Sequence, residues 1–481
     1  RPAECRNMSH NGAPLETLRK LIAAGGPFPA LRRLLSGAAR LVSVEEVAPE
    51  AKALFAACLA AEERAPVAVI AYSEEEAERL HEGLLTFGIP AERAALIPST
   101  EGILFEDGAP DWSVLGARLR GLARLALGEA CVLVMPLPAA LVRTCPRAQF
   151  AAGLVRVAVG DRLDLKEAAA GLAARGYRRT DLVTEIGEFS VRGGLLDVWP
   201  PSAQSPVRIE LFGDDVESIR SFDVESQRSS AHLTDVLLPP AREIMPGEAG
   251  ERAAGVLQAH LDEQVEALRA QGRPSDADAL ELRVSEHLNA MRQGAAFNGM
   301  EYYLPFLTGG EQCLLDWLPA DALIIWDEPS LCRSGWERLQ EELAEVHTAR
   351  IARGQALALD REHHIPFERA RERILERRCV AVSSLPHQSS WQQTPHRLSF
   401  PSAAMDSFGA QAGVFAENVR TWIEHGCSVV VVTPNVLRVG QMLRDLGVRP
   451  VRGELRAELE PGAYVLEGEL AHGFQLLEHR V

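Results

Sequence analysis

Apolar and polar positions alternate most clearly near the middle of the chain. Residues 207–211 (VRIEL) place apolar side chains at every second position, which is the period of a half-buried strand. A Gly-Asp-Asp turn follows, and 216–222 can run back as the partner strand. Upstream, 188–199 is a further strand-like run, in which a pair of glycines predicts a bulge or a sharp turn. We therefore predict an antiparallel β module at 177–229.

Continuous apolar runs nearer the N-terminus predict buried parallel strands. Residues 66–72 (PVAVIAY) and 131–135 (CVLVM) are two such runs. The first is followed by a helical pattern that opens with Ser73 and Glu76, the spacing of a capping box. A second helical pattern, 115–127, lies between the two strands. Strands that alternate with helices in this way indicate a parallel sheet in an α/β domain.

The later part of the chain is predicted to return to this sheet. Helical patterns cover 251–271 and 336–355, and the apolar run 323–326 lies between them. If this run joins the first sheet, the β module is an insertion. A further α/β unit is expected near the C-terminus, where the apolar strand 427–434 precedes a helix at 436–446.

Two segments precede that last unit. Residues 367–378 (FERARERILERR) carry glutamates and arginines in neighbouring stripes, the pattern of a solvated helix with ion pairs. Residues 383–407 are rich in Ser, Pro and Gln and are predicted to form a loop.

Composition places the chain among ordinary globular proteins. It has 481 residues, of which 47% are apolar and 24% charged, and this length predicts three to four domains. The formal net charge of −17 argues against strong intrinsic binding to nucleic acid. No apolar run is long enough to cross a membrane, so no membrane partner is expected.

The cysteines do not form a recognisable site. The eight cysteines are scattered, without a CxxC pair or a Cys/His cluster, so neither a zinc site nor a redox dithiol is indicated. Cysteines such as Cys131 and Cys427, which open apolar strand-like runs, are expected to be small buried residues. This usage indicates a reducing compartment, and we expect a cytoplasmic protein.

The lysines exclude a nucleotide-binding P-loop. A Walker loop needs glycines that wrap the phosphates and a following lysine that reaches the β and γ oxygens. Only three of the 50 basic residues are lysines, namely Lys20, Lys52 and Lys166, and none of them follows a glycine. The sequence therefore contains no GK[ST] motif.

The β module carries a resemblance to a known family. The pattern GYRRTDLVTEIGEFSVRGGLLDVWPP, continued by PVRIELFGDDVESIRSFD and QRS, resembles the corresponding module of bacterial transcription-repair coupling factor. The B subunit of the nucleotide-excision repair nuclease is a looser relative. Weaker similarity extends to 98–125, 299–307 and 471–481.

The resemblance implies a partner and the residues that contact it. In the family this module docks on the UvrA-type damage-recognition ATPase, and the matching positions here are Arg178 or Arg179 together with Arg192, with Phe189 adjacent. The alternative from the residues alone is that the arginines form ion pairs with nearby acids on a solvated face. The module contains 6 arginines and 10 acids between 176 and 228, so recognition there must be local.

The resemblance also implies a degenerate nucleotide site. The family comparison places the lost phosphate loop at 47–52 (VAPEAK), where Pro49 lacks an N–H group and Glu50 adds negative charge before Lys52. An ordinary loop before a helix is the simpler interpretation of this segment. The strand ending in Asp327 and Glu328 is similar to a Walker B motif, whose aspartate holds magnesium in an active ATPase. Without a P-loop, acids at an exposed strand end are the simpler interpretation.

These observations predict an α/β multidomain fold, in which a degenerate P-loop-type parallel-sheet domain carries an inserted antiparallel β module and precedes a second small α/β domain. The expected division is a disordered N-terminus at 1–13, the first part of the UvrB-like α/β domain at 14–150, the UvrA-binding module at 151–228, the second part of the α/β domain at 229–366, and a linker helix with the small domain at 367–481.

The expected function is that of a non-catalytic scaffold without a catalytic residue, metal or cofactor. By the family pattern, RNA polymerase and DNA would be bound through an RNA-polymerase-binding domain and an ATP-driven DNA translocase that lie outside this chain. The alternatives are an ATP-dependent excision-nuclease B subunit or helicase fragment, and a free-standing regulator. The interval 105–112 is too short for the long aromatic hairpin of the excision subunit, which counts against direct damage verification.

Overall fold

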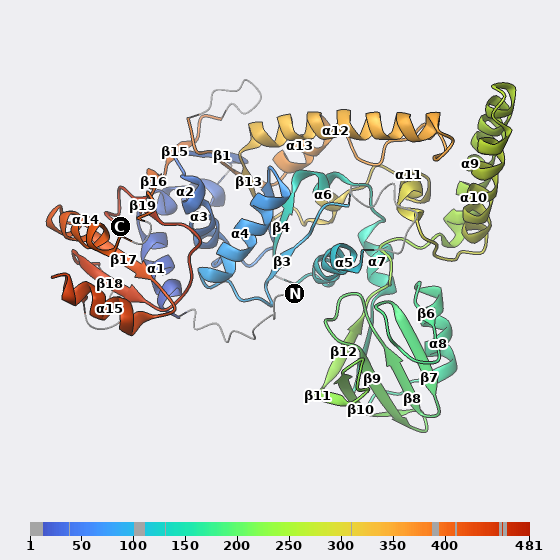
Figure 1. The fold of residues 1–481 in the computed structure, drawn as a ribbon, viewed down its shortest axis with the longest axis horizontal. Coiled ribbons are helices and arrows are strands. Elements are labelled where there is room, and N and C mark those ends of the chain that lie inside the picture. Colours follow the sequence, from blue (N-terminus) through green and yellow to red (C-terminus); the bar gives the residue numbers. More distant parts are fainter. Residues whose placement is uncertain are drawn as a thin grey trace.

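The computed structural model describes residues 13–37, 39–100, 111–129, 131–308, 310–386, 394–408, 411–451, 455 and 459–481 (Figure 1). Residues 1–12 of the N-terminus that was predicted to be disordered, and most of the interval 105–112, lie outside these ranges, whereas Ala13 begins a helix.

A seven-stranded sheet forms the centre of the large domain. All of its neighbouring strands are parallel, and their order is β15-β1-β14-β13-β2-β4-β3. The predicted α/β class is therefore confirmed. The strands are β1 (Leu41–Glu45), β2 (Val67–Ala71), β3 (Ala94–Leu96), β4 (Val132–Pro136), β13 (Leu323–Asp327), β14 (Arg378–Val382) and β15 (Arg397–Ser399).

Each face of this sheet is covered by a separate hydrophobic core. Successive side chains of a strand point to opposite faces, so Leu323 and Ile325 join one core while Ile324 and Trp326 join the other. On the first face lie α1 (Ala13–Ala24), α2 (Phe28–Ser36), α3 (Lys52–Ala60) and α4 (Glu74–Thr86). On the second lie α5 (Trp112–Leu127), α6 (Leu137–Leu141), α7 (Arg147–Gly153) and α13 (Phe367–Leu375).

Local signals place the ends of these helices. Ser73 accepts a hydrogen bond from the Glu76 amide at 3.2 Å and caps α4, as predicted. Gly88 follows this helix with φ of +83°, a left-handed conformation that costs glycine little. Gly128 ends α5 in the same way.

The β module is inserted between β4 and β13, as predicted. Its six-stranded sheet has the order β11-β10-β9-β8-β7-β6, and a separate pair is formed by β5 and β12. Helix α8 (Leu165–Ala174) packs on one face. The strands are β5 (Val155–Ala158), β6 (Arg178–Arg179), β7 (Glu188–Arg192), β8 (Leu195–Val198), β9 (Val207–Phe212), β10 (Asp215–Phe222), β11 (Ser229–Leu233) and β12 (Asp235–Leu238).

Strand pairing corrects the expected end of the module at 228. Strand β11 pairs with β10, and β12 pairs with β5 at the very start of the module. The chain therefore leaves the module only after β12, because its first and last strands are hydrogen-bonded to each other. The predicted strands and turns inside the module are confirmed, and the two glycines form a sharp turn between β7 and β8.

Two long helices extend from one end of the molecule. After the module the chain forms α9 (Gly247–Ala270) and α10 (Pro274–Arg292), which pack side by side and project beyond the large domain (Figure 1). Short turns around α11 (Leu304–Leu307) lead to β13, and α12 (Pro329–Ala352) follows it. None of the described helices is long and apolar enough to cross a membrane.

The C-terminal unit lies at the opposite end of the large domain (Figure 1). It contains two parallel strands with a helix after the first, and a short antiparallel pair that packs on the first core. The elements are α14 (Ala412–Glu424), β17 (Ser428–Val432), α15 (Val436–Asp445) and β18 (Gly462–Leu466), with β16 (Ser402–Ala404) and β19 (Phe474–Leu476) as the antiparallel pair.

The expected boundary at 367 is wrong. Strand β14 follows it, yet lies between β1 and β13 in the middle of the large sheet. Helix α13 is not merely a solvated linker, because Phe367, Ala370 and Ile374 are buried against the second core. The predicted loop at 383–407 also contains strands β15 and β16.

We expect Ile374→Ala to destabilise the large domain by about 2–5 kcal/mol, because it leaves a cavity under α13. Urea titrations of the purified protein would measure the change. The matched control is Arg369→Ala on the exposed side of the same helix, which should lie within about 0.5 kcal/mol of the wild type. Equal effects of the two substitutions would mean that α13 is solvated on all sides.

Candidate functional site

The inner face of the six-stranded sheet forms the core of the β module. Side chains from β7 to β10 pack there with Leu172 of α8. Phe189 belongs to this core and is fully buried. The expectation that Phe189 lies beside the arginines on a contact surface is therefore corrected. Its ring packs in the core on the inner face of the sheet, opposite the face that carries Arg192.

Strand β6 at the edge of the sheet exposes two of the predicted arginines. Arg178 donates hydrogen bonds to Glu185 at 2.8 Å and to Glu188 at 2.7 Å. The Glu188 side chain is buried and also accepts the amide of Thr184. Arg178 thus forms the ion pairs that the alternative interpretation describes, whereas Arg179, next on the strand, is exposed.

Arg192 shares a buried carboxylate with a second arginine. The Asp197 side chain is 1% exposed and accepts hydrogen bonds from Arg192 Nη2 at 2.9 Å and from Arg208 Nε and Nη2 at 2.7 and 2.8 Å. The guanidinium group of Arg208 also stacks over the ring of Phe222 at 4.6 Å. Hydrogen bonding to Asp197 raises the pKa of Arg208. Asp197 therefore fixes both arginines on the outer face.

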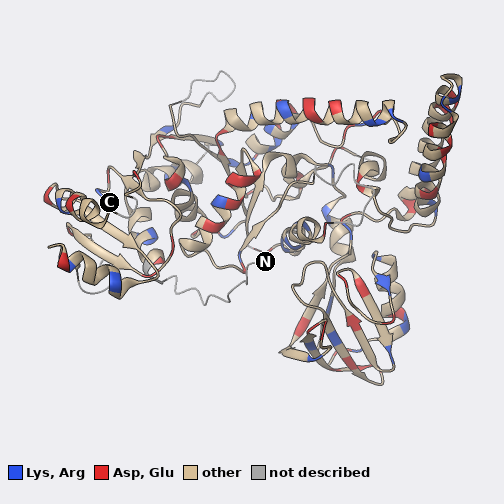
Figure 2. Cartoon of the chain, in the orientation of Figure 1, with Lys and Arg blue, Asp and Glu red and all other residues tan. Residues whose placement is uncertain are grey.

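Sequence reasoning missed Asp197 and Arg208 as a pair. They are directly opposite each other on β8 and β9, and Ser190 of β7 is opposite Asp197 on the other side. The available signal was a single acid inside an apolar strand, LLDVW, since a buried carboxylate needs a cation nearby. Figure 2 shows acidic and basic residues together on the strands of the module, which agrees with a local site rather than a broad basic surface.

The second candidate lies where β13 ends. Residues Pro49–Ala51 form one 3₁₀ turn, and α3 begins at Lys52. The Lys52 ammonium is 2.6 Å from Asp327 Oδ1 and 2.8 Å from Glu328 Oε1, and its side chain is only 3% exposed. We call Lys52, Asp327 and Glu328 the ion triad.

The ion triad corrects the interpretation of these acids as an exposed strand end. Asp327 is buried, and Glu328 is held by further hydrogen bonds from the amide and hydroxyl of Ser384, both at 2.7 Å. Glu328 has φ of +40°, so the backbone turns sharply into α12 at this point. Lys52, which the sequence assigned to a lost phosphate loop, therefore neutralises the chain's own acids.

Burial and charge act against each other in the ion triad. Burial raises the pKa of Asp327 to about 7, although the ammonium group of Lys52 opposes this. Burial would also raise the pKa of Glu328, but Lys52 and Ser384 lower it overall. Burial alone would lower the pKa of Lys52, yet the attraction of both acids raises it. Lys52 is therefore charged at neutral pH, and its charge is used within the protein.

The ion triad does not form a metal centre with its surroundings. No group of three His, Cys, Asp or Glu side chains that could hold a metal ion occurs in the part of the chain that the structure describes. Glu50 and Pro49 precede α3, and Arg79 donates a hydrogen bond to the carbonyl of Pro49 at 2.8 Å. This turn is therefore hydrogen-bonded to α4. Unlike a Walker loop, it contains no glycines that could wrap around a phosphate group.

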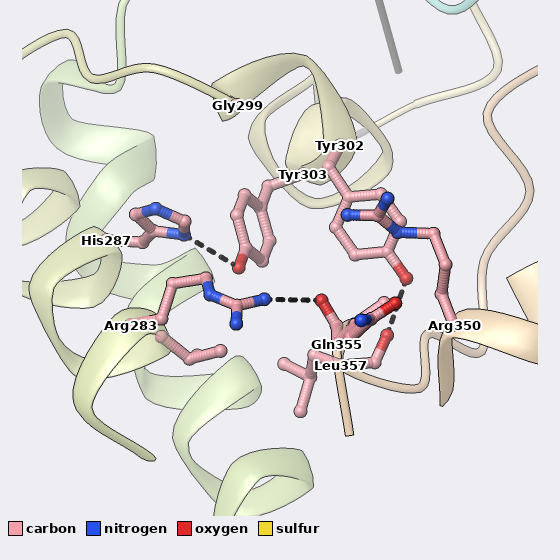
Figure 3. A pocket seen from close by; sticks show the side chains of 10 residues that line it. Arg283, His287, Gly299, Tyr302, Tyr303, Arg350, Gln355 and Leu357 are labelled. Carbon is pink, nitrogen blue, oxygen red and sulfur yellow. Dashed lines mark hydrogen bonds between the residues drawn. The ribbon is translucent and has the colours of Figure 1, made fainter. Parts of the chain in front are cut away.

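A small cavity beside α10 is not a ligand site. Its volume is about 20 Å³, which is room for about one water molecule. Figure 3 shows His287 of α10 directed at Tyr303 and Arg283 of the same helix directed at Gln355. Arg283 donates a hydrogen bond to the carbonyl of Gln355 at 2.6 Å at this cavity.

A larger hollow of about 440 Å³ lies in the C-terminal unit. It is lined by residues of β17 and by aromatic side chains, including Phe408, Phe415, Trp422 and Phe474. The apolar strand expected at 427–434 forms as β17, but most of this strand is only half-buried where it borders the hollow. Cys427 is likewise half-buried, whereas Cys131 is buried as predicted.

Comparison with known proteins adds the family context. Residues 155–244 match the family model described as the UvrB interaction domain. Over 435 residues the chain is 29% identical to a transcription-repair-coupling factor of Bacillus subtilis. This match covers 89% of the present chain and 36% of the relative. The chain resembles transcription-repair-coupling factors. The corresponding protein of Myxococcus xanthus is 30% identical over 441 residues, covering 85% of this chain and 36% of the relative.

A third relative is matched over a shorter stretch. The transcription-repair-coupling factor of Haemophilus influenzae is 28% identical over 238 residues, or 49% of this chain. The chain spans about a third of the length of the first two relatives. The resemblance that the sequence motifs predicted is therefore confirmed. The matched span begins at the first residue of β5 and ends after β12, in agreement with the strand pairing.

We expect Lys52→Met to destabilise the large domain by about 3–5 kcal/mol, because it leaves two acids in a buried position without their cation. Urea titrations would measure the loss. Lys20→Met is the matched control, since Lys20 is exposed on α1, and it should change stability by less than about 0.5 kcal/mol. If both substitutions have the same small effect, the ion triad does not stabilise the fold.

The ion triad also predicts a pH dependence. Between the ordinary aspartate pKa of about 3.9 and the raised pKa of Asp327 at about 7, the folded chain binds more protons than the unfolded chain. The free energy of unfolding should therefore fall as pH rises through this window. Relative to Asp327→Asn, the wild type should lose about 1–3 kcal/mol between about pH 5.5 and about pH 8.

Urea titrations of both proteins at the two pH values provide the measurement. Asp321→Asn is the control, because Asp321 is exposed just before β13 and its removal should leave the pH profile of the wild type unchanged. A wild type that gains stability relative to Asp327→Asn as pH rises would contradict the raised pKa of Asp327.

Proposed function

We propose that this chain is a non-catalytic scaffold in transcription-coupled nucleotide-excision repair. Its β module recruits a UvrA-type damage-recognition ATPase to RNA polymerase stalled at a DNA lesion. The observation that carries this proposal is the match of residues 155–244 to the UvrB interaction domain, within a chain that resembles transcription-repair-coupling factors. The site of action is the cytoplasm.

The recruiting residues are the exposed arginines of the module. Arg192 is half-exposed and is held in place by Asp197, so little side-chain freedom is lost when a partner binds. Arg179 is exposed on the edge strand. Arg178 contributes less, because Glu185 and Glu188 already bind it. Phe189 acts from the core, where it positions β7.

The large domain acts as a rigid support. Lys52 is already bound by Asp327 and Glu328, so its charge is not available for the β and γ phosphates of a nucleotide. This supports the scaffold over an ATP-dependent excision-nuclease B subunit or a helicase fragment. RNA polymerase and DNA are bound by other parts of the full-length protein.

The experiment is a calorimetric titration with the UvrA-type protein of the same organism. We expect the wild type to bind, and Arg179→Ala with Arg192→Ala to weaken binding by tenfold or more, which corresponds to about 1.4 kcal/mol or more. The control is the double variant Arg338→Ala with Arg369→Ala, which removes two exposed arginines outside the module and should bind as the wild type does.

The outcomes separate the parts of the proposal. Binding that survives in the double variant moves the interface away from these arginines. No binding by the wild type would leave only a shared fold, and the recruiting function would then be withdrawn. Equal losses in the test and control variants would indicate a general effect of charge instead of a local surface.

A further inference from the structure

The chain passes between the large domain and the β module at two places. It enters the module between α7 and β5, and it leaves after β12 through residues 239–246, which we call the exit strap. Arg175, just after α8, joins both crossings to the module. Its side chain donates a hydrogen bond to the carbonyl of Gly153 at 3.0 Å, and its own carbonyl accepts the amide of Ala241 at 2.9 Å. Both crossings therefore lie at one end of the module, about which it could pivot (Figure 1).

Apolar packing alone does not fix the module at this joint. The core of the module and the two cores of the large domain are separate clusters of buried side chains. A cavity of about 30 Å³ lies beside the exit strap, which is room for about one water molecule. Domains of one chain move relative to each other unless their interface is large and apolar. A fixed orientation of the module therefore requires directional contacts.

Two neighbouring charged residues of the exit strap supply such contacts. Glu243 accepts hydrogen bonds from the guanidinium group of Arg118 on α5, through Nε and through Nη2, the latter at 3.3 Å. Arg242 donates a hydrogen bond through Nη1 to Glu301 at 3.0 Å. We call Arg118, Arg242, Glu243 and Glu301 the strap clamp.

The strap clamp is shielded from water and attached firmly to the large domain. Arg118 is fully buried, and the other three side chains are at most 15% exposed. Arg118 also donates to the carbonyl of Ala139 at 3.0 Å, and Glu243 accepts a further hydrogen bond from the hydroxyl of Thr144. Removing one charge of a buried pair leaves the other charge without a partner, which is strongly unfavourable. The clamp therefore stays closed unless its charges are neutralised.

The two ion pairs hold the exit strap from different elements. Arg118 lies on α5, which precedes the module in the sequence, whereas Glu301 lies in the 3₁₀ turn Met300–Tyr303, which follows α10. A single contact would leave the strap free to rotate about it. Two contacts to separate elements remove this freedom.

The body of the module approaches α5 closely in the orientation that the clamp keeps. A Cβ atom at Gly187 would lie 2.8 Å from the ring of Trp112, and one at Gly116 would collide with the carbonyl of Pro201. The guanidinium group of Arg242 lies over the same Trp112 ring at 5.4 Å. The first residue of α5 thus contacts both the strap clamp and the module.

We propose that the strap clamp is an orientation lock, which holds the β module in one direction relative to the large domain. When its acids are neutralised, the module pivots about the two crossings while both domains stay folded, because each has a core of its own. The lock requires no partner, so it is independent of the proposed function.

The test measures the distance between two nitroxide labels by pulsed electron paramagnetic resonance. One label is attached to Glu217→Cys on β10 of the module and the other to Glu342→Cys on α12 of the large domain, because both positions are exposed. Cys5 and Cys427 are first replaced by serine, since the other six cysteines are buried and do not take the label. We expect a single narrow distance distribution in this background.

Glu243→Gln with Glu301→Gln should broaden the distribution by about twofold or more, because the module is then free to pivot. The matched control is Asp278→Asn with Glu281→Gln, which neutralises two exposed acids that bind Arg269 on α9. The control should keep the narrow distribution. Circular dichroism shows whether each variant folds. If the test variant does not fold, Glu301→Gln alone neutralises one of the two pairs and should broaden the distribution in the same way.

Three outcomes would overturn the lock. A broad distribution before any acid is replaced would mean that the clamp does not fix the module. A narrow distribution in the folded test variant would mean that other contacts set the orientation. Equal broadening in the test and control variants would indicate a general effect of the lost negative charge.

Discussion

One buried ammonium group connects segments of the large domain that are far apart in the sequence. Lys52 lies before the inserted module, Asp327 and Glu328 lie after it, and Ser384 binds Glu328 from the loop that follows β14. The interaction joins the start of α3 to the carboxyl end of β13. A sheet interrupted by an insertion must recover its strand order after the insertion, and this contact helps to define where β13 lies.

The inserted module has a hydrophobic core of its own. Its first and last strands, β5 and β12, are paired, so the chain enters and leaves at one place. This geometry allows a large insertion without disturbing the order of the parallel sheet. It also leaves the hairpin turns of the module far from α5, where they can contact another protein (Figure 1).

The outer face of the module shows how strand register brings opposite charges together in an acidic protein. A chain with a net charge of −17 does not attract a negatively charged partner over long distances. A shared carboxylate, Asp197, instead holds the two arginines that the strand register places beside it. In the proposed function, recognition of the partner therefore depends on local geometry more than on the total charge of the module.

Local sequence determined the secondary structure because its signals act over a few residues. The alternation of 207–211, the turn at Gly213 and the cap at Ser73 were all readable, as was the lack of a lysine after glycine. Family motifs also indicated Arg178, Arg179 and Arg192, whose exposure the structure describes and whose partner contacts stay a prediction.

Tertiary structure decided what each of these elements contacts. Burial of Phe189, the sharing of Asp197 and the place of β14 in the middle of the sheet depend on strand register and order. The pairing of Lys52 with Asp327 joins residues on either side of the module, and no local pattern encodes such a contact. Sequence alone indicated most of the strands and helices, although it missed β15 and β16, whereas long-range packing decided which charges meet and which faces stay exposed.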